Sequence, residues 1–331
     1  MALFKRNKLL KDDPATGLGN NGNTVGTRYY RKDGSANVHK RGMRLLDRFS
    51  WYHTMLEMPR WKFWLSILII FILVNTIFAF TYLWIGMEGM AGVEKGPFWT
   101  QFSEAFFFSA QTFTTVGYGR INPIGFWSGL VASFEAFLGL LSFALATGLL
   151  YGRFSHPQAF LRFSEKALIA PYKDGRGLMI RVTPYKNNHL TDVEVKLTLG
   201  LRFIEEGKPV NRFYPLGVEL AQINTLFLNW TIVHAINEKS ALYQLSIEEL
   251  RNLKAELIVF IKAFDETFSN TVVARSSYAA EEFLFGHRFI SMYHQSEDGE
   301  STILELDLLN ATEEVALPPV IPPSTEYSPG G

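Results

Sequence analysis

Two long runs of hydrophobic positions lie in the first half of the chain. The first covers residues 61–87, where the only cation is Lys62, and the second covers residues 124–151. Each exceeds the roughly 20 apolar residues that a helix needs to cross about 30 Å of hydrocarbon. At about 1.5 Å per residue the second run would extend about 40 Å, so it must tilt or protrude. The pattern predicts two membrane-spanning helices in a membrane domain at residues 59–153.

A shorter aromatic and apolar stretch, residues 98–114, lies between the two predicted spans. It leads directly into the sequence Thr114-Thr115-Val116-Gly117-Tyr118-Gly119. Because it is too short to cross the bilayer, we expect it to enter the membrane as a helix and to return as extended chain. Non-helical backbone at membrane depth is tolerated only where its carbonyl groups line a polar cavity. These carbonyls are therefore candidate ligands for a cation.

Upstream of the first span, residues 44–58 place large apolar side chains at helical spacing among charges. This pattern is typical of a helix in the membrane interface, and an ordinary amphipathic core helix is the alternative. Residues 1–43 are rich in Gly, Asn, Lys and Arg and poor in large apolar side chains, which predicts a flexible basic arm. No signal-peptide pattern precedes the first span, so we expect that span to remain as an anchor.

Beyond about residue 163 the pattern changes to short segments rich in Val, Ile, Thr, Phe and Tyr. They predict a β-sandwich domain at residues 154–310. Ser246 and Glu249 form a capping box, which predicts one short helix over residues 246–253. Residues 311–331 are rich in proline, which predicts a disordered tail. The predicted strand segments are 177–184, 191–204, 211–220, 227–236, 255–266, 271–285 and 301–309.

The distribution of charge predicts the orientation in the membrane. Arg44, Arg48, Arg60 and Lys62 precede or open the first span, whereas residues 88–98 carry one lysine and two glutamates. Lys and Arg favour the cytoplasmic side, so we expect both termini of this multi-pass chain in the cytoplasm. The same four residues, with Arg153 after the second span, are candidate contacts for anionic membrane lipids.

Composition excludes several other functions. The chain has 32 basic and 32 acidic residues, so no basic excess points to nucleic acid. It has no cysteine, and its seven histidines do not follow a metal-ligand spacing. The sandwich contains no nucleophile elbow, Walker loop or paired-carboxylate motif. We therefore expect neither an enzyme nor an organic cofactor.

The sequence of residues 115–119, Thr-Val-Gly-Tyr-Gly, resembles the selectivity filter of potassium channels. Gly117 and Gly119 admit backbone angles that are closed to other residues, so successive carbonyls can point inward. The resemblance implies that potassium ions bind the carbonyls of Thr115, Val116, Gly117 and Tyr118 and the hydroxyl of Thr115. One chain supplies one loop, so a ring of four copies, a homotetramer, is required.

Further stretches are similar to the prokaryotic branch of the inward-rectifier potassium channels. They are Gly177-Leu-Met-Ile-Arg181, residues 229–240, Ser276-Ser-Tyr278 and Phe285-Gly-His-Arg-Phe289. The resemblance implies a membrane α-helical pore with two transmembrane helices and a re-entrant pore helix, followed by a C-terminal cytoplasmic immunoglobulin-like β-sandwich. It also implies a slide helix at residues 44–58 and a location in the bacterial inner membrane. Other two-span potassium channels carry a nucleotide-binding regulator, but no Gly-x-Gly-x-x-Gly follows a predicted strand here.

Three features depart from the pattern of the eukaryotic members. Their pore-helix glutamate corresponds to Gln111, and Arg120 comes one residue earlier than its partner arginine, so we expect at best an amide-to-guanidinium brace for the filter. The acidic residue that holds blocking polyamines corresponds to Phe143, which implies weak block. The basic cluster that binds phosphoinositides is reduced to Arg153 and Arg162.

The second span carries candidates for filter support and gating. Glu135 is an ionisable group inside the membrane, so we expect it near the inner end of the filter, with a structural hydrogen bond as the alternative. Phe143 and Tyr151 share a helical stripe, and in the family bulky residues at these positions form the gate. Simple packing against lipid or other helices is the alternative. Gly139 and Gly148 are candidate hinges or sites of close helix packing.

Taken with the resemblance, the sequence predicts one subunit of a passive, potassium-selective channel of the inward-rectifier type. A membrane-anchored scaffold or receptor, in which the sandwich binds a partner and the pore is vestigial, is the alternative. The intact sequence of residues 115–119 favours the channel.

Overall fold

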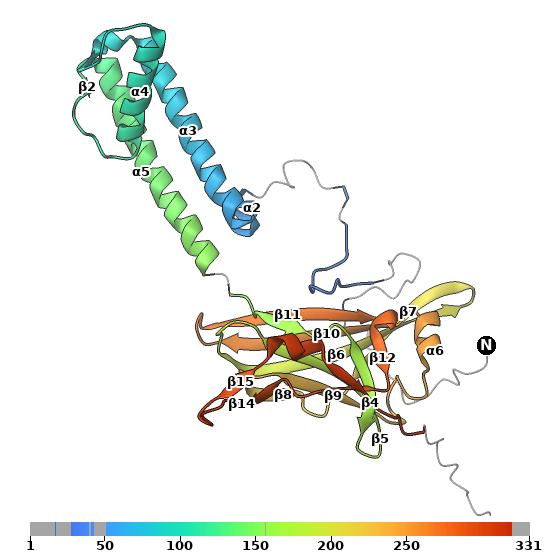
Figure 1. The fold of residues 1–331 in the computed structure, drawn as a ribbon. Helices are drawn as coiled ribbons and strands as arrows, with labels where there is room; N and C mark the ends of the chain where they lie inside the picture. The colour runs from blue at the N-terminus through green and yellow to red at the C-terminus, as the bar shows by residue number, and fades with distance from the viewer. Residues whose placement is uncertain (1–16, 18–27, 40, 43–50, 156, 320–331) are drawn as a thin grey trace, which may run out of the picture. The chain divides into compact units, whose positions relative to one another are not determined.

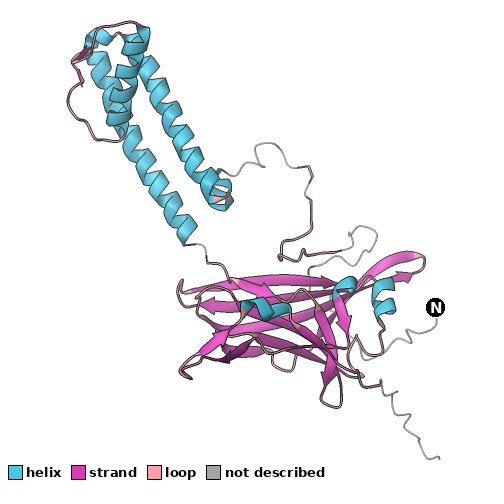
Figure 2. Cartoon of the chain, in the orientation of Figure 1, coloured by secondary structure: helices cyan, strands magenta, loops and turns pink. Residues whose placement is uncertain are grey.

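The computed structural model describes residues 17, 28–39, 41–42, 51–155 and 157–319 (Figure 1). Its contacts divide the chain into two units, a membrane unit of residues 41–156 and a second unit of residues 1–40 and 157–331. Helices make up most of the first and strands most of the second (Figure 2). Arg44 and Arg48, and with them the start of the predicted slide helix, lie outside the described residues.

Two long apolar helices form the frame of the membrane unit. They are α3 (Arg60–Ile85) and α5 (Phe126–Phe154), and both are long and apolar enough to cross a membrane. Between them in sequence lies α4 (Phe98–Phe113), the expected re-entrant helix. A short helix, α2 (Trp51–Glu57), ends just before Pro59, which cannot continue a helix and instead starts α3. These bounds confirm the two predicted spans and the helix between them.

Small residues allow the three longer helices to pack closely. Ala79 of α3, Ala105 of α4 and Ala132 of α5 are all buried in one cluster. Tyr82 and Phe108 meet edge to face in the same cluster, with ring centroids 5.2 Å apart. After α3 the chain forms η2 (Met87–Gly89) and β1 (Met90–Ala91), and β1 pairs antiparallel with β2 (Asn122–Pro123). This pairing ties together the two segments that flank α4.

Two five-stranded sheets form the second unit. In the first sheet the long β6 pairs with β10 on one side and with β7 and β8 on the other, and β11 pairs with β10. In the second sheet β5 pairs with β9 on one side and with β3 and β4 on the other, and β12 runs parallel to β4. The strands of the first sheet are β6 (Leu190–Glu205), β7 (Lys208–Leu216), β8 (Gln222–Leu226), β10 (Glu256–Asp265) and β11 (Asn270–Ala279). Those of the second are β3 (Leu161–Phe163), β4 (Ala167–Tyr172), β5 (Gly175–Pro184), β9 (Trp230–Ile236) and β12 (Phe283–Phe285).

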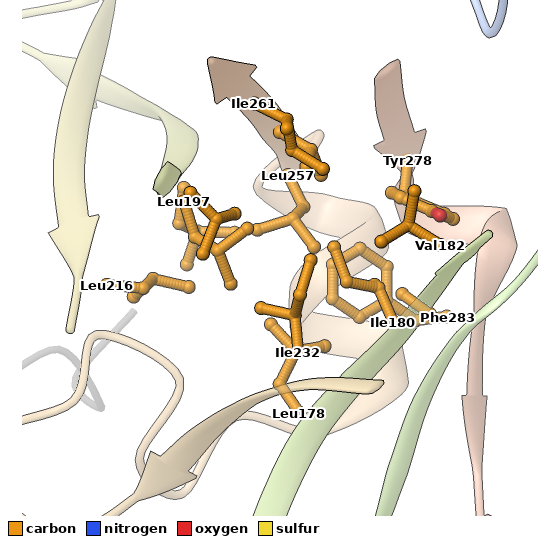
Figure 3. Packing of buried hydrophobic residues seen from close by; sticks show 14 of the residues in the cluster. Leu178, Ile180, Val182, Leu197, Leu216, Ile232, Leu257, Ile261, Tyr278 and Phe283 are labelled. Carbon is orange, nitrogen blue, oxygen red and sulfur yellow. The ribbon is translucent and has the colours of Figure 1, made fainter. Parts of the chain in front are cut away.

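The core lies between the two sheets. Leu178, Ile180 and Ile232 of the second sheet point toward Leu197 and Leu257 of the first (Figure 3). In β6 the odd-numbered positions from 193 to 201 are buried, so the alternating hydrophobic pattern of the sequence corresponds to the inner face of the sheet. This arrangement confirms the predicted β-sandwich.

Smaller elements complete the second unit. The predicted capping box is present at α6 (Ile247–Asn252), where the Glu249 N–H donates to the Ser246 hydroxyl at 3.2 Å and the Ser246 N–H donates to the Glu249 carboxylate at 2.8 Å. The remaining elements are η3 (Ala280–Glu282), β13 (His287–Phe289), β14 (Tyr293–Gln295), β15 (Thr302–Leu304), η4 (Leu306–Asn310) and β16 (Thr312–Glu314).

Both ends of the described chain are more ordered than the composition predicts. Within the expected flexible arm, residues 28–39 contact the sandwich: the backbone N–H groups of Tyr29 and Tyr30 donate to the buried carboxylate of Glu256 at 2.8 and 3.1 Å. Within the expected disordered tail, β16 pairs with β13, and the Arg176 guanidinium donates twice to the Pro318 carbonyl. The predicted boundaries at residues 43 and 311 therefore do not coincide with the ends of ordered structure.

Candidate ion-conduction site

The loop of residues 114–119 follows α4 with the backbone angles that a filter requires. Gly117 and Gly119 have φ values of +51° and +84°, in the left-handed region that favours glycine. Thr115 also has a positive φ, 60°, which is unusual for a β-branched residue and costs on the order of 1–3 kcal/mol. The glycine conformations match the expectation from the sequence, whereas the strain at Thr115 was not foreseen.

Hydrogen bonds to the end of α4 hold the inner half of the loop. The Gln111 carbonyl accepts from the N–H groups of Val116 at 2.9 Å and Gly117 at 3.3 Å. The Thr115 N–H donates to the Thr112 carbonyl at 3.0 Å. Donors from the loop thus point back toward the helix, and this leaves the loop carbonyls free to face a bound cation. Gln111 supports the loop through its backbone oxygen.

The outer end of the loop is held by different partners. The Asn122 side chain donates to the Gly119 carbonyl at 2.9 Å. The Arg120 guanidinium donates to the carboxylate of Glu104 on α4 at 2.6 Å. We expected Arg120 to pair with the side chain of Gln111, and this expectation is wrong because a carboxylate on an earlier turn of α4 takes the guanidinium.

A buried polar cluster connects α3, α4 and α5 behind the loop. The Glu135 carboxylate accepts from the Tyr82 hydroxyl at 2.6 Å and from the Ser109 hydroxyl. The Ser109 hydroxyl also lies 2.9 Å from the Asn75 side-chain oxygen, and all three of Asn75, Ser109 and Glu135 are buried. Glu135 therefore bonds to the re-entrant helix, and the partners show how a carboxylate is tolerated at membrane depth.

The sequence analysis missed three members of this cluster. Asn75 interrupts an otherwise apolar run, and that interruption was the one signal available. Tyr82 is one of several aromatic residues near the end of the first apolar run, and Ser109 resembles any other small residue of the aromatic stretch. Their meeting with Glu135 depends on how three helices pack, which the local pattern does not encode.

The two candidate hinge glycines have different surroundings in α5, which is one continuous helix. A Cβ atom added at Gly139 would lie 2.0 Å from the Phe113 carbonyl oxygen at the end of α4. Of the alternatives left open by the sequence, close packing is therefore the one that Gly139 satisfies. Gly148 has no such neighbour within 4 Å, so its surroundings leave room for bending.

The C-terminal half of α5 exposes the candidate gate residues. Phe143 and Tyr151 are each 74% exposed in the single chain, a large apolar exposure for ring side chains. Phe143 also lines an apolar hollow of about 700 Å³ that reaches Thr114 and Thr115 at the inner end of the loop. Both residues lie in the C-terminal half of α5, and their role as a gate remains a prediction.

Arg153, a predicted lipid contact, is instead bonded to protein. Its guanidinium donates to the carbonyls of Met55 at 2.6 Å and Met58 at 2.7 Å, at the end of α2. It also stacks over the Phe63 ring at 4.6 Å. Arg60 and Lys62 are exposed at the start of α3 and remain candidate lipid contacts.

A two-span helical unit with a re-entrant helix, a glycine-bearing loop and an attached β-sandwich defines a class: subunits of two-span cation channels. Comparison with known families agrees. Residues 55–155 match the ion channel family model, and residues 161–327 match the inward rectifier potassium channel C-terminal domain. The chain belongs to the inward rectifier potassium channel family.

Individual relatives support this assignment across most of the chain. The inward rectifier potassium channel Kirbac3.1 of Paramagnetospirillum magnetotacticum is 30% identical over 282 residues, which cover 83% of this chain and 92% of the relative. The human G protein-activated inward rectifier potassium channel 2 is 30% identical over 294 residues, 79% of this chain and 67% of the relative. The family consists of ion channels, so the protein is a membrane channel subunit and not an enzyme.

Proposed function

We propose that four copies of this chain form a homotetramer around one pore and carry potassium passively across the bacterial inner membrane. The loop of residues 115–119 carries this proposal. Its Val116 and Tyr118 side chains are 53% and 80% exposed in one chain, as expected of residues that neighbouring copies would cover. Potassium ions would bind the carbonyls of residues 115–118 and the Thr115 hydroxyl, and no organic cofactor is needed.

The proposal extends to topology and gating. Both termini would lie in the cytoplasm, and the chain would comprise a slide helix to residue 58, a pore domain at 59–153 and a sandwich from 154. Phe143 and Tyr151 would form the gate, because four aromatic rings around the axis exclude water and provide no oxygen ligands for potassium. Gly148 would serve as the hinge, and Arg60 and Lys62 would contact anionic lipid headgroups.

Liposome flux tests the central proposal. Purified tetramers reconstituted into liposomes should take up rubidium and potassium well above sodium, and barium should block the uptake. Gly117→Ala is a suitable negative control, because alanine does not adopt the positive φ of Gly117 without strain, although the space around it is open. Equal sodium uptake through an assembled wild-type tetramer would refute potassium selectivity. No uptake of any cation would favour a scaffold or receptor with a vestigial pore.

A further inference from the structure

The filter loop is attached to α4 at two places, and the sequence analysis anticipated a different partner for the outer one. The inner half is tied to α4 by the Gln111 backbone carbonyl. Among the described residues, the Arg120–Glu104 ion pair is the one bond recorded between residues 118–120 and α4. Glu104 is therefore the residue through which α4 directly holds the outer half of the loop.

The two partners of this ion pair differ in their exposure to solvent. The side chain of Glu104 is only 13% exposed, whereas that of Arg120 is 59% exposed. A carboxylate that has lost most of its hydration needs another interaction to offset the cost of desolvation. The charge-assisted hydrogen bond from Arg120, 2.6 Å long, provides that interaction. Removal of the arginine would leave the shielded Glu104 carboxylate without a positively charged partner beside the loop.

The backbone of Arg120 is also fixed from the opposite side. Gly92 adopts a φ of +79°, and a Cβ atom added there would lie 1.8 Å from the Arg120 carbonyl oxygen. The pairing of β1 with β2 and the bond from Asn122 to the Gly119 carbonyl hold the same stretch. These contacts restrain the main chain of residues 119–123, and the Arg120 side chain adds the link from this stretch to Glu104 on α4.

We propose that Glu104 is a positioning residue that fixes the outer half of the selectivity filter through Arg120. This inference rests on the proposed function of the loop as a potassium filter. Glu104 does not contact the ion. It keeps the Tyr118 and Gly119 carbonyls at the spacing that distinguishes potassium from sodium, since both follow the movement of Arg120.

The test compares the charge-removing variant Glu104→Gln with Arg120→Gln, the double variant and the reversed pair Glu104→Arg/Arg120→Glu. Glu88→Gln is the matched control, because Glu88 is an exposed acid between the two spans that does not interact with Arg120. The readout is the ratio of rubidium to sodium uptake in liposomes containing assembled tetramers. A merely structural role would change tetramer yield and leave this ratio constant.

We expect either single variant to lower the ratio by about tenfold, which corresponds to roughly 1.4 kcal/mol of lost discrimination. The double variant should be no worse than the single ones, because both remove the same bond. The reversed pair should recover part of the ratio, and Glu88→Gln should behave as wild type.

The outcomes separate this inference from the proposed function. If wild type does not discriminate potassium, the proposed function fails. If wild type is selective and Glu104→Gln keeps its ratio, or if the reversed pair assembles with no recovery, the positioning role is wrong. Loss of tetramers in both Glu104→Gln and the reversed pair would assign the pair to assembly and would also overturn the inference.

Discussion

At the scale of single residues, the membrane unit combines apolar helices with a few buried polar side chains that are hydrogen-bonded to side chains on other helices. Glu135 is buried yet bonded to Tyr82 and Ser109 on two other helices. An unpartnered carboxylate at this depth would be very costly, so the cluster makes the arrangement of α3, α4 and α5 specific as well as stable. Through Ser109 the cluster also holds α4, the helix that leads into the loop of residues 114–119.

The predicted weak block by polyamines depends on Phe143. It offers no negative charge to a cytoplasmic polycation, so the wild-type channel should show weak block by spermine. Phe143→Asp should increase spermine affinity by roughly tenfold or more, because a tetramer would place four carboxylates around a water-poor axis. Current recordings in planar bilayers with spermine on the cytoplasmic side measure this, and Phe143→Asn is the control of similar size without charge. If wild type is blocked as strongly as the Asp variant, another residue holds the polyamine.

The glycine conformations of the loop at residues 115–119 could be predicted from the sequence, but the partners that hold the loop could not. Residues 115–119 form a contiguous motif, and the positions of Gly117 and Gly119 indicate where its backbone adopts a positive φ. Glu104 lies 16 positions before Arg120, and nothing in the spacing indicates that the two side chains meet. Pairings of this kind arise from helix packing and from the path of the return loop, which local periodicity does not specify.

At the scale of elements, the hydrophobic pattern of the sequence predicted the helices more accurately than the strands. The long apolar runs gave α3 and α5 to within a few residues, because a membrane span needs length and hydrophobicity more than any particular neighbour. The predicted strand segments did not include β3, of three residues, or β4, of six residues. Unlike a helix, each of these strands forms its hydrogen bonds with another segment of the chain, in both cases with β5. Short strands carry little periodicity, so they become identifiable only when the sheet is known.

The coupling of α2 to α5 bears on the gate. Arg153, two residues after Tyr151, donates to the carbonyls of Met55 in α2 and of Met58 just after it, so a movement of α2 would be transmitted to the C-terminal end of α5. Arg153 serves here as a cap for a helix C-terminus, where a cation also complements the helix dipole. The expectation that it contacts lipid overlooked this internal acceptor.

Tyr151→Ala tests whether the cytoplasmic end of α5 forms the gate. If the aromatic rings seal a closed state, the variant should raise basal rubidium uptake severalfold, and Phe143→Ala added to it should raise uptake further. Leu145→Ala is the matched control, because Leu145 is 70% exposed on the same helix but lies about 200° around it from Phe143. Uptake unchanged in the double variant, with tetramers and selectivity intact, would place the gate in the filter itself.

At the scale of the whole molecule, the sandwich unit includes a segment from the other end of the sequence. Residues 28–39 precede the membrane unit, yet they are held by Glu256 and by the Arg28 guanidinium, which bonds to the Ser277 hydroxyl and carbonyl. The chain therefore connects the two units at both ends of the membrane unit. Composition predicted a flexible arm here because short polar segments rarely order alone, and this one orders through its partners on the sandwich.

Lys32 should make the docking of residues 28–39 depend on pH. Its ammonium lies 3.4 Å from the centre of the Tyr278 ring, 3.6 Å from the Glu282 carboxylate, and donates to the Glu165 carbonyl. Burial outweighs the attraction of Glu282 and lowers the Lys32 pKa from 10.5 to about 8. The positive charges of Arg28 and Lys166 act in the same direction as burial.

The sign of the effect follows from the lowered pKa. Undocked Lys32 holds its proton up to about pH 10.5, whereas docked Lys32 releases it above about pH 8, so docking is more favourable at high pH and weakens as the pH falls through about 8. The chain has no cysteine, so a spin label on Val38→Cys, an exposed position in this segment, reports docking alone. Its mobility should fall between pH 7 and pH 10, and Lys32→Gln should remove most of that dependence, because glutamine keeps a polar donor without a titrating charge. A wild-type label with constant mobility over this range would mean that Lys32 keeps its proton when docked and that the ion pair with Glu282 outweighs the cost of burial.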